Sequence, residues 1–160
     1  MKTAWKCTAV GFVSVMLLCV LALLPAASAA STLDVGVTFW KEKGEQTSMA
    51  DDGVDHDRTA TLTRQPNGTY TLELPVKKLS KVNMIGCLTG LSIGDVSYDG
   101  VLSGKFADGT AVLTIKNLPA SILTGSDNSK ALAVTANIEM DVRLLGELTT
   151  PTRLCIWAEK

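Results

Sequence analysis

The chain has little of what catalysis usually requires. Its 160 residues contain one histidine, His56, and aromatic residues make up only 5% of them. A serine or cysteine nucleophile needs a base positioned beside it, and no serine lies in a nucleophile-elbow motif. His56 lies between Asp55 and Asp57, which is typical of a solvated polar turn. We therefore predict that the protein is not an enzyme.

Positive charge is not concentrated anywhere in the sequence. The chain has 15 basic and 16 acidic residues, and the basic ones are scattered. Proteins that bind nucleic acids gather lysine and arginine into a stripe that faces the phosphates. The sequence thus argues against nucleic acid as a partner.

The first thirty residues have the pattern of a signal peptide. Lys2 and Lys6 supply positive charge, Val10 to Leu24 is apolar, and Ala27-Ser28-Ala29 offers the small residues that signal peptidase requires. The apolar run of about fifteen residues is shorter than the roughly 20 of a membrane-spanning helix. This favours a leader at residues 1–30 over a retained anchor, and it predicts a secreted, extracellular protein.

The mature chain, residues 31–160, is expected to form one domain. Its length suffices for a single hydrophobic core, and it contains no second long apolar segment. Cys87 and Cys155 are its two cysteines. An even pair in an exported domain predicts a structural disulfide, although two separate buried thiols remain an alternative.

Strand patterns recur along this mature chain. Apolar and polar residues alternate from Val134 to Leu144 and again from Tyr70 to Val76. Asn67-Gly68 suits the positive φ angles of a tight turn, so residues 58–76 are expected to form a hairpin. Asp99-Gly100 and Asp108-Gly109 predict further turns. More strands are expected at residues 35–40, 101–106, 111–115 and 154–157.

Evidence for helix is thin. Ser48 can cap a turn through Met49 to Asp52, and residues 118–123 can form another turn. About eight short strands with regularly spaced turns predict an all-β fold. Within that class we expect an immunoglobulin-like antiparallel β-sandwich with one short helical turn.

Four aspartates near this turn, Asp51, Asp52, Asp55 and Asp57, raise the alternative of a calcium-stabilised module. Calcium takes six to eight oxygen ligands, which loop carboxylates can supply. The spacing does not match a D-x-D-x-D-G loop, and no bidentate glutamate follows at the expected distance. Calcium is therefore a minor hypothesis.

Several segments resemble the NEAT (near-iron transporter) family of bacterial haem-capturing modules. They are Val37-Thr38-Phe39-Trp40, Ser48-Met49-Ala50, Asn67-Gly68-Thr69-Tyr70 and Pro151-Thr152-Arg153-Leu154. The resemblance implies that a short helix, here Ser48 to Asp52, caps one face of haem. It also implies that a late strand supplies the iron ligand, normally through a Y-x-x-x-Y pair.

The corresponding late strand, Ala133 to Leu145, contains no tyrosine but carries Met140. Thioethers also ligate haem iron. We therefore predict iron ligation by Met49 from the cap and Met140 from the strand, with Ser48 beside Met49 and Met84 as a third candidate. On an apolar face, Met140 can equally be core filler. The lysines available to the propionates are Lys77, Lys78 and Lys81.

The leading hypothesis is thus a secreted haem-binding protein that captures haem for iron acquisition and exchanges it with a donor or receptor protein. Two alternatives remain open. One is a non-catalytic adhesion or protein-interaction module with the same fold and no haem, which the missing tyrosines favour. The other is the calcium-stabilised module.

Overall fold

The computed structural model describes residues 30–81, 84–140 and 147–159, and it is almost entirely β-structure. The predicted signal peptide, apart from Ala30, lies outside these ranges. None of the helical segments within them is long or apolar enough to cross a membrane. The strands are β1 (Ser31–Lys41), β2 (Ala60–Arg64), β3 (Tyr70–Pro75), β4 (Leu79–Lys81), β5 (Met84–Ile93), β6 (Val96–Ser103), β7 (Val112–Leu118), β8 (Leu132–Met140) and β9 (Glu147–Ala158). Four 3-10 turns join them, namely η1 (Asp51–Gly53), η2 (Phe106–Asp108), η3 (Ala120–Ile122) and η4 (Asn128–Lys130).

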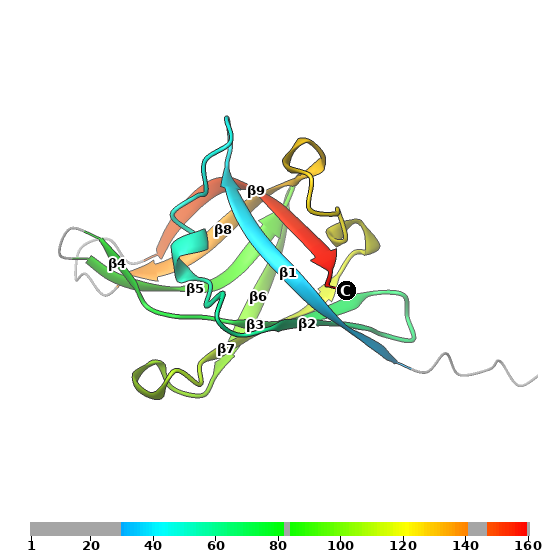
Figure 1. Cartoon of the computed structure of the whole chain (residues 1–160), viewed down its shortest axis with the longest axis horizontal. Helices are drawn as coiled ribbons and strands as arrows, with labels where there is room; N and C mark the ends of the chain where they lie inside the picture. Colours follow the sequence, from blue (N-terminus) through cyan, green and yellow to red (C-terminus); the bar gives the residue numbers. More distant parts are fainter. Residues whose placement is uncertain (1–29, 82–83, 141–146, 160) are drawn as a thin grey trace, which may run out of the picture.

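The strands form one antiparallel sheet that closes on itself (Figure 1). The order is β4-β5-β6-β7-β3-β2-β1-β9-β8, and β8 also pairs with β5. Eight strands therefore form a closed, barrel-like ring in the order β5-β6-β7-β3-β2-β1-β9-β8. Strand β4 is outside this ring and pairs with β5. The all-β prediction is confirmed. The two-sheet sandwich is wrong, because the β5–β8 pairing removes the free edges that two separate sheets would have.

Strand β5, which closes the ring, was not expected from the sequence. It contains Gly86 and Gly90, and glycine inside a strand weakens the strand pattern. At both positions, atoms of a neighbouring strand lie so close to the backbone that a side chain would not fit. A Cβ at Gly86 would lie 2.5 Å from Sδ of Met140, and one at Gly90 would lie 2.5 Å from the carbonyl oxygen of Tyr98. The two glycines thus weaken the strand pattern of β5 in the sequence, and they also allow the neighbouring strands to pack closely against β5.

Other predicted elements agree with the structure in part. The hairpin of β2 and β3 is confirmed, with Gly68 at φ +83° in its turn. β6 starts at Val96, so the turn expected at Asp99-Gly100 is wrong, because both residues pair within strands. The stripe starting at Val134 is strand β8 as far as Met140, and its remainder lies outside the described residues.

The core fills the interior of the closed sheet. In β1, Val35, Val37 and Phe39 alternate with residues on the outer face, which is the period of two that a half-buried strand requires. The largest side chains that are fully buried come from η3 and from every strand of the ring except β6: Phe39, Leu62, Leu72, Leu74, Leu88, Leu91, Leu113, Ile115, Leu118, Ile122, Ile138 and Leu154.

The predicted disulfide is absent, because Cys87 and Cys155 are both free thiols. Cys87 lies on β5 opposite Glu139 of β8. Cys155 lies on β9 opposite Thr38 of β1, and its thiol contacts the carbonyl oxygen of Asp127 at 3.6 Å. Two cysteines paired with different neighbouring strands do not meet, so the alternative of separate thiols is correct.

Candidate ligand-binding site

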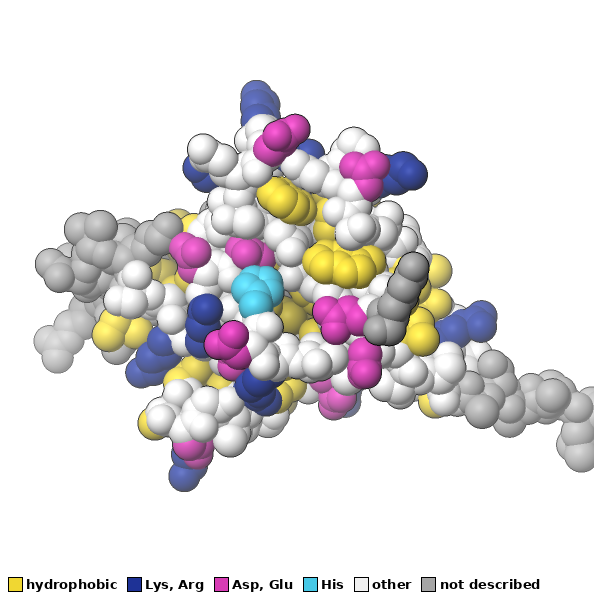
Figure 2. All heavy atoms as spheres, viewed as in Figure 1, with side chains coloured by type: hydrophobic (Ala, Val, Ile, Leu, Met, Phe, Trp, Pro, Cys, Tyr) yellow, Lys and Arg dark blue, Asp and Glu magenta, His cyan; other side chains and the backbone are white. Residues whose placement is uncertain are grey.

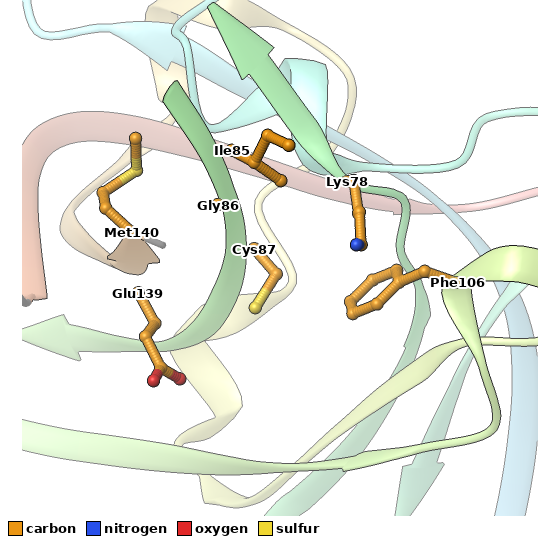
Figure 3. Close-up of a pocket in the computed structure, with 7 residues that line it drawn as sticks. All are labelled: Lys78, Ile85, Gly86, Cys87, Phe106, Glu139 and Met140. Carbon is orange, nitrogen blue, oxygen red and sulfur yellow. The ribbon is translucent and has the colours of Figure 1, made fainter. Parts of the chain in front are cut away.

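A cavity of about 240 Å³ opens beside the end of β8 (Figure 3). The β4–β5 region, η2 and β8 bring its walls together, although they are distant in the sequence. The cavity combines apolar, sulfur-containing and charged groups, and it is lined by Lys78, Ile85, Gly86, Cys87, Phe106, Glu139 and Met140.

Met140 is both a wall of this cavity and a core residue. It ends β8 opposite Gly86 and is only 6% exposed. Because Gly86 has no side chain, the sulfur of Met140 lies directly against β5. The structure thus places this predicted ligand at a hollow, and it also gives Met140 the packing duty of a core side chain.

Cys87, Phe106 and Lys78 form the other side of the cavity. Figure 3 shows the Cys87 thiol, the Phe106 ring and the Lys78 side chain directed toward one shared space. Cys87 and Met140 lie on opposite faces of the sheet, because Cys87 pairs with Glu139 and adjacent residues of a strand point to opposite faces. Sequence reasoning missed Cys87 and Phe106 as site residues, since neither lies in a motif.

The Cys87 thiol has a raised pKa. Burial of the thiol disfavours the charged thiolate and is the largest cause, and the nearby carboxylate of Glu139 adds to it. The ammonium group of Lys78 partly opposes the increase. At neutral pH Cys87 therefore presents a neutral thiol to the cavity.

The predicted capping turn exists and packs on the core. Hydrogen bonds from Asp51 N–H to Ser48 C=O and from Asp52 N–H to Met49 C=O form it, at 3.1 and 3.2 Å. Ser48 is 3% exposed, and its hydroxyl oxygen accepts a hydrogen bond from the Ala50 N–H at 3.3 Å. Met49 is half-buried against the core.

Met49 is not among the residues that line the cavity beside Met140. The two methionines therefore do not share this hollow, as a pair of ligands on one iron would. Met84 is the first residue of β5 and pairs with Lys81. Its side chain lies outside what the structure describes.

Carboxylates of the acidic loop next to the turn contact other groups of the same chain. Asp51 accepts the Phe39 N–H at 2.8 Å with Oδ1, and Oδ2 lies 3.1 Å from Nε2 of His56. Asp55 lies 3.9 Å from the guanidinium of Arg58. Within the described ranges, no group of three or more histidine, cysteine, aspartate or glutamate side chains is arranged to hold a metal ion.

A second hollow, of about 500 Å³, shares Glu139 and Met140 with this cavity and is more acidic. It is lined by Thr89, Asp99, Gly100, Glu139, Met140 and Glu147. Glu139 and Glu147 are direct neighbours on β8 and β9. Its three carboxylates would repel the propionates of a haem, so the cavity with Lys78 is the better candidate site.

Comparison with known proteins gives few matches. No protein-family model matches the chain, and no curated protein matches it. Among solved structures, the chain is similar to the NEAT5 domain of IsdX2, a B. anthracis hemophore, in complex with heme, and to a mutant of that domain, also with heme. Each is 16% identical with a TM-score of 0.49, and each alignment covers 81% of this chain and 98% or 97% of the other. Both of these solved structures are NEAT domains.

Proposed function

We propose that the protein is an exported haem-binding protein, which captures haem for iron acquisition and exchanges it with a donor or receptor protein. One observation carries the proposal. Met140, at the end of β8, is one of the residues that line a cavity that also offers an aromatic ring, Phe106, and an ammonium group, Lys78. A haem site needs these three things: an iron ligand, an apolar wall and a cation for the propionates.

Each residue has a role in this proposal. Met140 supplies the iron ligand, Phe106 and Ile85 pack against the porphyrin, and Lys78 pairs with a propionate. Thioether ligation raises the reduction potential of a bound haem and favours ferrous iron. Met49, on the capping turn and away from the cavity lining, covers the core rather than forming a second ligand at this hollow.

The size of the cavity limits how haem is held. Pockets that enclose a ligand of this kind have volumes of about 300–1,000 Å³, whereas this cavity has about 240 Å³. A porphyrin would therefore enter by one edge and keep the rest of its surface outside. Edge binding suits a protein that passes its ligand on, because release needs no opening of the closed sheet.

Titration of the purified protein with haemin, followed by visible absorption, tests the proposal. We expect a Soret band that saturates at one haem per chain and shifts on reduction. Met140→Leu nearly conserves the volume but removes the sulfur, so it should weaken binding and move the band. Met49→Leu, which makes the same change at a methionine that does not line the cavity, is the matched control. No Soret band in either oxidation state would refute haem binding, and an unchanged Met140→Leu spectrum would refute the ligand.

A non-catalytic protein-interaction module is a second candidate, and the surface of β6 favours it. Val96, Val101 and Leu102 are 54%, 66% and 42% exposed on this strand. Leu102 pairs with buried Leu113, so Val101, one residue earlier, points to the outer face, where an exposed apolar side chain can contact a partner. A protein that shows no Soret band, and whose binding to a partner is lost when Val101 is changed to Lys, would have this second function.

The proposed export depends on the predicted leader. Cleavage after Ala29 or Ala30 leaves a mature chain that begins at Ala30 or Ser31. The intact mass of the protein recovered from the medium measures this directly. A chain that retains residues 1–29 would contradict the secreted location.

A further inference from the structure

The capping turn holds both backbone polar groups of Phe39. The Phe39 carbonyl accepts the Ser48 N–H at 2.8 Å, and the Phe39 N–H donates to Oδ1 of Asp51, also at 2.8 Å. Strand β1 pairs with β2 only as far as Val35. Beyond Val35, the capping turn supplies hydrogen-bond partners on the edge of β1 that β2 no longer covers. The Asp51 carboxylate thus replaces a neighbouring strand and ties the turn that carries Met49 to the barrel.

His56 binds the second oxygen of the same carboxylate. Its Nε2 lies 3.1 Å from Oδ2 of Asp51, with side-chain exposures of 47% for His56 and 12% for Asp51. An imidazole becomes charged as the pH falls through about 6.5. His56 is the only histidine in the chain.

Carboxylates surround His56 on several sides. Asp51 comes from η1, and Asp55 and Asp57 flank the histidine in its own loop. Asp55, His56 and Glu159, which follows β9, line one small cavity. Figure 2 shows the histidine at the surface with acidic side chains close to it. A charged imidazole is therefore met by negative charge from three elements.

Two cations also lie in this region. The Arg58 guanidinium borders the same cavity, but it donates to two backbone carbonyls, at 2.7 and 3.0 Å, and lies 3.9 Å from Asp55. Lys77 is exposed, and its backbone N–H donates to the Gly53 carbonyl at 2.9 Å. Neither of these contacts of Arg58 and Lys77 involves the Asp51 carboxylate, whereas His56 contacts it directly. Protonation of His56 would therefore place a positive charge next to this carboxylate.

We propose that His56 is a pH-sensitive latch for the capping turn. In mildly acidic medium the charged imidazole strengthens its bond to Asp51, and Asp51 in turn holds Phe39 and the turn more firmly. In neutral to alkaline medium the pair is weaker, and the turn with Met49 opens more often. This inference does not depend on haem, because the contacts lie in the protein alone.

Hydrogen exchange of the Phe39 amide tests the latch. We compare its protection factor, corrected for intrinsic exchange, at about pH 5.5 and pH 8. Partly exposed ion pairs of this kind change an opening equilibrium roughly two- to fivefold, so protection should be higher by that factor at the lower pH. Amides of β8 should change much less. An unchanged Phe39 protection factor would overturn the proposal.

The matched variant is His56→Gln, whose amide can still donate to Asp51 but does not titrate in this range. Its Phe39 protection should be independent of pH, and an undiminished pH effect in the variant would overturn the proposal. Peroxide oxidation of Met49 gives a second readout, because an opened turn exposes its sulfur. Oxidation should be slower at the lower pH in the wild-type protein only, and equal rates at both pH values would also contradict the latch.

Discussion

The sulfur of Met140 lies so close to Gly86 that a Cβ on Gly86 would be 2.5 Å from it. The same Cβ would be 2.7 Å from the backbone oxygen of Glu139. This contact joins β5 to β8, closes the sheet and forms one wall of the candidate site. Fold and site therefore depend on one residue that has no side chain.

We expect Gly86→Ala to destabilise the protein by about 1–3 kcal/mol, because the added methyl group must displace both the sulfur and a backbone oxygen. Gly53→Ala is the control. The nearest atoms to a Cβ there belong to the side chains of Leu79 and Leu88, at 3.2–3.3 Å, so it should cost less. Urea denaturation of both variants measures the difference, and equal stabilities would contradict close packing at Gly86.

Met140 is expected to stabilise the core independently of any ligand. Truncation by Met140→Ala should lower the free energy of unfolding by about 2–5 kcal/mol. Met140→Leu should cost less than about 1.5 kcal/mol, because it conserves the volume. Denaturation without haem measures both values. A Met140→Ala variant as stable as the wild type would show that the side chain does not pack in the core.

Both cysteines should be free and should differ in reactivity. Thiol titration of the unfolded, unreduced protein should find both groups. In the folded protein Cys87 should react with a thiol reagent, because it is only half-buried, whereas buried Cys155 should react only after unfolding. A protein purified from an oxidising medium with no titratable thiol would contradict the separation of the two strands.

The raised pKa of Cys87 predicts a loss of stability at alkaline pH. Above about pH 8.5 the unfolded chain releases the thiol proton, while the folded chain still holds it because burial and Glu139 disfavour the thiolate. The unfolded state then binds fewer protons, so the free energy of unfolding falls as the pH rises. Denaturation at a series of pH values should show this fall in the wild type and a smaller fall in Cys87→Ser. Glu139→Gln should also reduce it.

The sequence predicted those parts of the fold that local patterns determine. Asn67-Gly68 requires a turn whatever surrounds it, and the alternation in β8 requires one buried face. β5 could not be predicted in this way, because Gly86 and Gly90 are explained only by contacts with Met140 and Tyr98, which are distant in the chain. Without β5, the remaining strands suggested two sheets instead of one closed sheet.

The candidate site was predicted less completely. Met140 was predicted as a ligand because it lies in the late strand that lacks the expected tyrosine, whereas its place on an apolar face favoured a core role. Cys87 and Phe106 carry no local signal, and only the folded chain places them on one cavity. The acidic loop was considered as a calcium site, but Asp51 accepts a hydrogen bond from the Phe39 N–H. Its carboxylate completes the hydrogen bonding of a strand edge.

Paramagnetic NMR of the ferric haem complex tests the central claim most directly. Unpaired electrons on the iron broaden the amide signals of nearby residues and leave distant ones sharp. The account predicts broadening at Ile85, Gly86, Phe106 and Met140, with sharp signals at Asn67 and Thr114, which line a separate polar groove. Broadening centred on that groove, or spectra identical with and without haemin, would contradict a haem site beside Met140.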